Sequence, residues 1–81
     1  MRAKQWNDLA TRQLKAELTR QGVGYADLVR RLRSMGVRET YASVANKISR
    51  GAFSFAFFLQ CMKALDRNDL KLIDDLGHRA H

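Results

Sequence analysis

Glycine is the only strong helix-breaking residue in this 81-residue chain, which contains five glycines and no proline. The glycines fall at positions 22, 24, 36, 51 and 77. Glycine readily adopts the left-handed conformation that ends helices, so each position is a natural helix stop. Between these stops the apolar residues recur at helical spacing rather than alternating as in strands. We therefore expect an all-α fold, a compact bundle of about five short helices.

The expected helices cover residues 3–21, 25–35, 40–50, 55–65 and 69–76. In the first, Trp6, Ala10 and Leu14 follow one another at steps of four, which predicts a shared buried face. The fourth is the most apolar. We expect it to be central to the core, with the aromatic residues around its start buried: Phe53, Phe55, Phe57 and Phe58.

Local start signals support two of these helices. Gly24 can cap the second helix, and Asp27 follows where a negative charge favours the positive end of the helix dipole. Ser54 can cap the fourth helix, with Phe53 packing onto Phe58 across the first turn. Both signals place a helix start within a residue or two.

Composition indicates one globular domain over residues 1–81, with 46% hydrophobic and 28% charged residues. The single cysteine, Cys61, cannot form an internal disulfide and is most simply a small buried hydrophobe. No Cys/His cluster has zinc-ligand spacing, and no apolar run reaches the roughly 18 residues of a membrane span. We expect a cytoplasmic protein that uses no metal, cofactor or small-molecule ligand and contacts no membrane.

Positive charge is concentrated in the first part of the chain. Residues 1–51 carry 11 Lys/Arg and 4 Asp/Glu, whereas residues 52–81 carry 4 of each, so the formal net charge of +7 arises entirely before residue 52. A one-sided positive field favours a polyanionic partner such as nucleic acid. The alternative is that the charge only keeps a small protein soluble.

The third expected helix has an unusual outward face. With Tyr41, Val44, Ala45 and Ile48 facing inward, a projection at 100° per residue places polar residues outward: Glu39, Ser43, Asn46 and Arg50, with Ala42, Lys47 and Ser49 at the margins. Solvent-exposed helix faces more often carry long Glu and Lys side chains. Small residues instead allow close approach to another surface, and Asn and Arg can bond bidentately to bases. The alternative is that Lys47 and Arg50 merely complement the helix dipole.

Three stretches together resemble the lambda-repressor-like, Xre-type helix-turn-helix domain: "LKAELTRQGVGYADLVRRL" (14–32), "GVRETYASVANKISRG" (36–51) and "FSFAFFLQCMKAL" (53–65). The shared features are a first helix ending in Gly, a Gly-Val turn before the recognition helix, and an "I-x-x-G" ending. More narrowly, "GVxYADL" and "NKISRGxFSFAFFLQCxKAL" look like a family of small bacterial domains whose role is unassigned. The chain differs from the helix-turn-helix pattern in having Arg33–Met35 before the turn and Tyr25-Ala26 where a Gln is usual.

The resemblance implies a sequence-preferring double-stranded DNA-binding protein, a bacterial or phage transcriptional regulator associated with the nucleoid. The third helix would enter the major groove, and its base-reading residues would be Thr40, Ala42, Ser43, Asn46 and Lys47. The residues that neutralise phosphates would be Arg30, Arg31, Arg33, Arg38 and Arg50.

Other readings of the sequence remain open. A protein-interaction adaptor on the same scaffold is one alternative. RNA binding is another, although we expect nearly all aromatic residues to face inward, where bases cannot stack on them. The last expected helix has an apolar stripe that suits either a homodimer face or packing within one chain: Leu70, Leu72, Ile73 and Leu76. No acid pair, nucleophile–base set or phosphate loop is visible, so we do not expect an enzyme.

Overall fold

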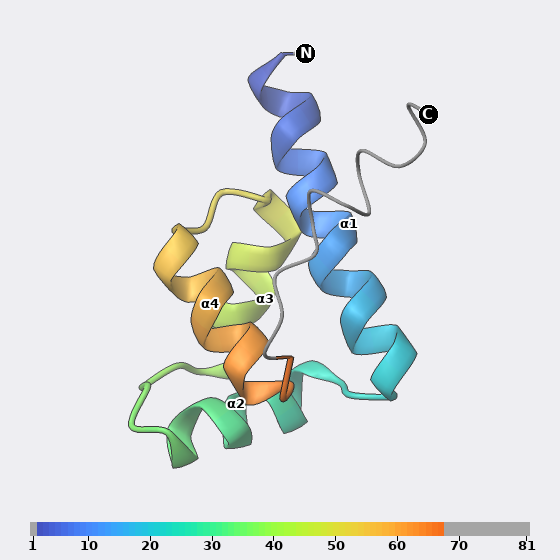
Figure 1. Cartoon of the computed structure of the whole chain (residues 1–81). Coiled ribbons are helices and arrows are strands. Elements are labelled where there is room, and N and C mark those ends of the chain that lie inside the picture. The colour runs from blue at the N-terminus through green and yellow to red at the C-terminus, as the bar shows by residue number, and fades with distance from the viewer. Residues whose placement is uncertain (1, 68–81) are drawn as a thin grey trace.

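The computed structural model describes residues 2–67, and these residues are helical apart from short connections (Figure 1). The four α-helices are α1 (Ala3–Gln21), α2 (Tyr25–Ser34), α3 (Tyr41–Arg50) and α4 (Phe55–Ala64). Within residues 2–67 there is no strand. The all-helical prediction is therefore confirmed, and four of the expected helices are present within a residue of their predicted ends. The fifth, 69–76, lies outside the described residues.

The helices begin and end on the residues that local chemistry favours. Gly51 adopts a left-handed φ of 66° directly after α3, and its N–H bonds back to carbonyl oxygens of the last turn. At the start of α4, Ser54 Oγ accepts a hydrogen bond from the Phe57 N–H at 3.0 Å. The same end of α4 is held by Phe53, whose ring stacks on Phe58 with centroids 6.4 Å apart. The predicted caps and staple are confirmed.

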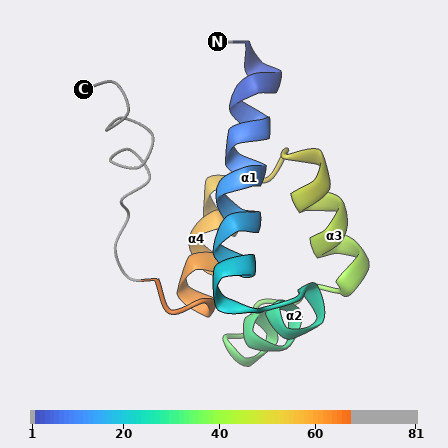
Figure 2. The ribbon, with the colours of Figure 1, turned by 90° about the vertical axis from the view of Figure 1, so that its right-hand side faces the viewer.

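One core unites all four helices. α3 packs against α1 and α2, and α2 also packs against α4 (Figures 1 and 2). Burying one large apolar side chain, such as Leu or Phe, stabilises the fold by about 1.5–3 kcal/mol. The buried apolar residues are Leu14, Leu18, Val23, Leu28, Val29, Leu32, Val44, Ile48, Phe57, Phe58, Cys61, Met62 and Leu65.

Three aromatic residues expected in the core are exposed instead. Trp6 is 54% exposed, because the N-terminal part of α1 extends past the other helices (Figures 1 and 2). Tyr41 is 59% and Phe55 is 66% exposed, each being the first residue of its helix. A helical stripe predicts a shared face, but it does not predict where the neighbouring helices stop covering that face.

The residues that precede the turn between α2 and α3 lengthen α2 only slightly. The helix ends at Ser34, and Met35 is 41% exposed. Gly36 then takes a φ of 86°, and the Val37 N–H donates to the Leu32 carbonyl at 2.9 Å. This hydrogen bond folds the chain back against the last turn of α2, so only a short segment separates α2 from α3.

Candidate nucleic-acid interface

The solvent-facing side of α3 is a stripe of small and polar residues. Ala42, Asn46, Ser49 and Arg50 are all exposed and lie at i, i+4, i+7 and i+8, on one side of the helix. Figure 2 shows α3 at the edge of the bundle, with α1 and α2 on its inner side. This stripe, the α3 face, contains no acidic residue and has only one long side chain.

The predicted base-reading residues divide into two groups. Thr40, Ala42 and Asn46 are exposed. Ser43 and Lys47 are only half-exposed, and their polar atoms bond within the protein rather than pointing away from it. The structure therefore centres the α3 face on Asn46 and places Ser43 and Lys47 at its flank.

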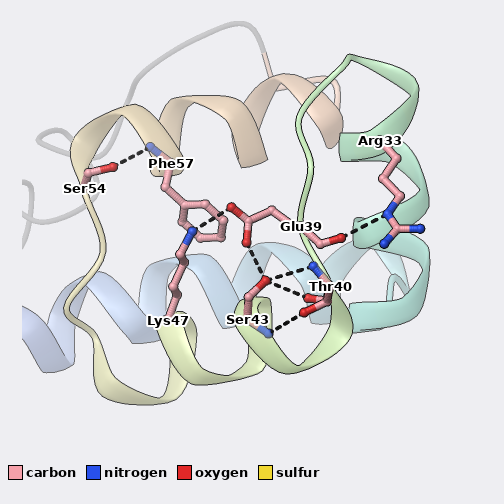
Figure 3. A network of polar contacts seen from close by, with 7 residues as sticks. All are labelled: Arg33, Glu39, Thr40, Ser43, Lys47, Ser54 and Phe57. Atoms are coloured by element: carbon pink, nitrogen blue, oxygen red, sulfur yellow. Dashed lines mark hydrogen bonds and ion pairs between the residues drawn. The ribbon is translucent and has the colours of Figure 1, made fainter.

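The start of α3 is built around a buried carboxylate (Figure 3). Glu39 is 9% exposed; its Oε1 accepts from Ser43 Oγ at 2.6 Å and its Oε2 from Lys47 Nζ at 2.6 Å. The Lys47 ammonium also lies 4.7 Å from the centroid of the Phe57 ring, so the group joins α3 to α4. Thr40 caps the helix: its Oγ1 accepts from the Ser43 N–H, and its own N–H donates to Ser43 Oγ.

The electrostatics of this group favour the ionised carboxylate. Burial by itself raises the pKa of Glu39, but hydrogen bonds from Lys47 and Ser43 and the charge of Lys47 outweigh burial, so the pKa lies below its usual range. Glu39 is therefore an anion whose charge is neutralised inside the protein. Because Lys47 neutralises this charge, Glu39 does not make the α3 face negative.

The outward position predicted for Glu39 is wrong. Thr40, the N-cap, has extended backbone, so Glu39 lies before the helix and the projection at 100° per residue does not apply to it. Its carboxylate turns back along the helix toward Lys47. The spacing of Glu39, Ser43 and Lys47 at four-residue steps is the one signal in the sequence that points to this contact.

All five arginines proposed for phosphate contact are exposed, but they differ in how they are held. Arg30 forms an ion pair with Asp27, and Arg31 Nη1 lies 3.4 Å from the Ala64 carbonyl. Both therefore have an interaction within the protein, which leaves less of each guanidinium for an outside anion.

Two of the arginines, Arg33 and Arg38, line the same open hollow in front of α3. Arg33 Nε donates to the Glu39 carbonyl at 3.0 Å, which ties the end of α2 to the segment before α3 (Figure 3). The hollow is lined by Arg33, Gly36, Arg38, Glu39 and Thr40. The fifth arginine, Arg50, lies at the other end of α3. The structure thus brings a cation to each end of the α3 face.

The remaining predictions concern a dimer face, metal binding and membrane contact. The proposed dimer residues, Leu70, Leu72, Ile73 and Leu76, lie outside the described residues. In the part of the chain that the structure describes, no group of three or more His, Cys, Asp or Glu side chains could hold a metal ion. No helix within residues 2–67 is long and apolar enough to cross a membrane.

Comparison with known proteins places this chain in a family without assigning it a role. A family model described as a domain of unknown function, DUF6471, matches residues 6–70, which is most of the chain. The chain belongs to the DUF6471 family. No curated protein and no solved structure matches it. The expectation of a family with an unassigned role is confirmed, whereas the resemblance to lambda-repressor-like domains stays a prediction. The α3 face is accordingly a feature of a DUF6471 domain whose function has to be argued from its geometry.

Proposed function

We propose that this protein binds double-stranded DNA with a sequence preference, using α3 as the recognition helix. The observation that carries the proposal is the α3 face, which is exposed, free of acidic residues and built from small side chains around Asn46. The major groove admits an α-helix, and small side chains let the helix approach the base edges closely. A helix face that only contacts solvent would commonly carry Glu, because Glu costs little helix propensity.

We assign base reading to the exposed residues from the N-cap to the middle of α3. Asn46 can bond bidentately to an adenine, and Ala42 and Thr40 can contact a thymine methyl group. Ser43 and Lys47 take a supporting role, because Glu39 holds both of them at the flank of the helix. Lys47 reaches a base or phosphate only by breaking its bond to that carboxylate.

Phosphate contact falls to the arginines around α3. Arg33 and Arg38 line the hollow in front of the helix, and Arg50 lies in its last turn. Arg30 and Arg31 on α2 add further positive charge. Each phosphate neutralised releases condensed counterions, so about 4–6 contacts predict a slope of about −4 to −5 in log affinity against log salt.

This role accounts for the uneven charge of the chain and implies a regulatory use. The net charge of +7 resides in residues 1–51, which include α2 and α3. A small DNA-binding domain of this kind would act at the nucleoid as a bacterial or phage transcriptional regulator. Dimerisation would pair two half-sites about 34–36 Å apart.

The test is selection of binding sites from random duplex DNA, followed by titrations on the selected site. The wild type should enrich a defined sequence. Asn46→Ala should lose about 1–3 kcal/mol of discrimination at one base pair. Arg38→Ala should bind all sequences more weakly and reduce the salt slope by about one. Lys63→Ala, which removes an exposed cation from α4, is the matched control and should change neither quantity.

The same titrations separate the competing roles. No enriched sequence together with a nearly flat salt response would contradict DNA binding. Salt-dependent association with an acidic protein, without a DNA complex, would favour an adaptor. Because Trp6, Tyr41 and Phe55 are exposed after all, single-stranded RNA belongs in the same series, and preference for it over duplex DNA would also contradict the proposal.

A further inference from the structure

The cations around α3 differ in whether a carboxylate neutralises them. In the part of the chain that the structure describes, no ion pair holds the arginines at the two ends of the α3 face, Arg33, Arg38 and Arg50. Arg33 bonds to a backbone carbonyl, which leaves its charge in place. Lys47, one turn before Arg50, is the exception, because its Nζ lies 2.6 Å from Glu39 Oε2. The α3 face thus has free positive charge at its ends and a neutralised lysine on its flank.

The contact between Glu39 and Lys47 is largely shielded from solvent on the carboxylate side. Glu39 is 9% exposed, and its other oxygen accepts from Ser43 Oγ at 2.6 Å. The Lys47 ammonium lies 4.7 Å from the centroid of the Phe57 ring, on the side of α3 that faces α4 (Figure 3). A buried carboxylate that loses its partner is strongly destabilised, whereas a contact between lysine and an exposed phosphate is weakened by salt. The balance favours Lys47 remaining on Glu39 when a phosphate approaches.

Without Glu39, Lys47 would be well placed to contact a phosphate. It follows Asn46 at about 100° around the helix, and its side chain is 40% exposed. The major groove is about 12 Å wide, scarcely wider than a helix with its side chains. A cation on the flank of a helix in that groove therefore meets the sugar-phosphate backbone. Phosphate contacts carry no sequence information, so this one would form on any duplex.

We propose that Glu39 limits non-specific DNA binding by holding Lys47 away from the phosphates. Glu39 touches no DNA itself and is a positioning residue that acts through Lys47. Non-specific binding is almost wholly electrostatic, so the absence of one phosphate contact weakens it, while the base contacts of Asn46 are unaffected. This inference rests on the proposed duplex binding, but it can fail while that function stands.

The experiment measures binding to a random-sequence duplex over a range of salt concentrations. Glu39→Gln keeps the size of the side chain and an oxygen that can accept from Ser43. It should bind random duplex about three- to tenfold more tightly near 0.1 M salt and steepen the salt slope by about 0.9, which corresponds to one phosphate. Glu39→Gln/Lys47→Met has no lysine to release and should return to the wild-type slope. On the selected site the gain should be smaller, because Asn46 fixes the register there.

Asp8→Asn is the matched control. Asp8 is paired with Lys4 on α1, at exposed positions, so this variant frees a lysine and adds the same unit of net charge. It should leave the salt slope unchanged. A purely structural role for Glu39 predicts the opposite of the proposal, namely weaker binding by Glu39→Gln as α3 loses its orientation.

Two results would overturn the proposal while leaving the proposed function intact. One is a folded Glu39→Gln protein that binds random duplex no more tightly than the wild type. The other is a Glu39→Gln/Lys47→Met protein that keeps the gain, because the gain would then not act through Lys47. No duplex binding by the wild type would end both proposals together.

A second variant decides if Glu39→Gln does not fold, as judged by far-UV circular dichroism. Lys47→Met in the wild-type background removes the lysine directly. The wild-type salt slope in this variant would support the proposal, because Lys47 then contacts no phosphate in the natural protein. A slope shallower by about one would refute it.

Discussion

Lys47 Nζ lies 2.6 Å from Glu39 Oε2, although only Lys47 belongs to α3 and Glu39 precedes its N-cap. The contact spans the first two turns of the helix and ends over the ring of Phe57 on α4. It removes one positive charge from the predicted recognition surface. The contact also joins α3 to α4 and so fixes the orientation of α3 in the bundle.

Replacing Lys47 should destabilise the protein more than its partly exposed position suggests. Lys47→Met leaves the buried Glu39 carboxylate without its strongest donor. We expect a loss of about 1–3 kcal/mol, which is less than for a fully buried pair because the Lys47 side chain is still 40% exposed. For a domain of this size, each kcal/mol lowers the melting temperature by about 4–8 °C. Thermal unfolding followed by circular dichroism measures it.

Lys63→Met provides the comparison, since Lys63 is an exposed lysine of α4. Its loss should change stability by less than about 0.5 kcal/mol. The double variant Glu39→Gln/Lys47→Met should recover part of the loss, because it removes the unpaired charge. A Lys47→Met protein as stable as Lys63→Met would show that the Glu39 contact contributes little.

Stability should fall in acid because of two buried glutamates. Burial raises the pKa values of Glu17 and Glu39, but hydrogen bonds and nearby cations outweigh it, so both pKa values lie below the ordinary 4.5. The unfolded state therefore binds more protons near that pH. The stabilisation is fully present above the unfolded value and is lost as the pH falls through the lowered folded values.

Urea unfolding between about pH 6 and pH 3 tests this dependence. The unfolding free energy of Glu39→Gln should change less with pH than that of the wild type, and the change that remains should come from Glu17. Asp8→Asn, at an exposed site on α1, serves as the control and should retain the wild-type slope. Identical profiles for wild type and Glu39→Gln would mean that Glu39 titrates alike in the folded and unfolded chains.

Gly51 should be far less replaceable than Gly22, although both have a left-handed φ near 66°. A Cβ at Gly51 would lie 2.6 Å from the Asn7 carbonyl oxygen, whereas a Cβ at Gly22 would meet nothing within 4 Å. Gly22→Ala should cost about 1–2 kcal/mol, from the backbone conformation alone. Gly51→Ala should cost clearly more, because α3 must also move away from α1. Equal losses in urea unfolding would contradict this packing.

Cys61 should behave as an inert thiol while the protein is folded. Burial, together with the negative charge of Glu39, raises its pKa to about 12. Since the thiolate is the reactive form, iodoacetamide at neutral pH should label Cys61 only through unfolding. Mass spectrometry of the labelled protein measures the rate, and labelling in urea gives the fully accessible reference. Rapid labelling of the native chain would mean that α4 opens locally.

The ends of the helices are the part of the fold that sequence reasoning predicts well. Ser54 caps α4 and Gly51 ends α3 as expected, because each signal depends on backbone groups within about four residues of it. The outward face of α3 was predicted less well. Asn46 and Arg50 are exposed as expected, but Glu39 is buried and Lys47 bonds to it, a contact that the projection of the helix alone does not show.

The exposed aromatic residues show the same difference between what a local pattern predicts and what packing decides. Periodicity places Trp6 on the stripe of Leu14, and both do lie on that side of α1, yet Leu14 is fully buried and Trp6 is 54% exposed. The stripe itself is a local property of an α-helix. How far along the stripe other helices extend depends on chain segments tens of residues away.

The sequence by itself therefore determined where helices form, where they stop and which residues share a face, because these follow from φ, capping and 3.6-residue periodicity. Only the tertiary structure decided which faces are covered and which charges are paired. Gly51 against Asn7, Lys47 over Phe57 and Arg67 on Glu17 each join residues brought together by packing. Burial and desolvation act between such distant residues, so no local pattern specifies them.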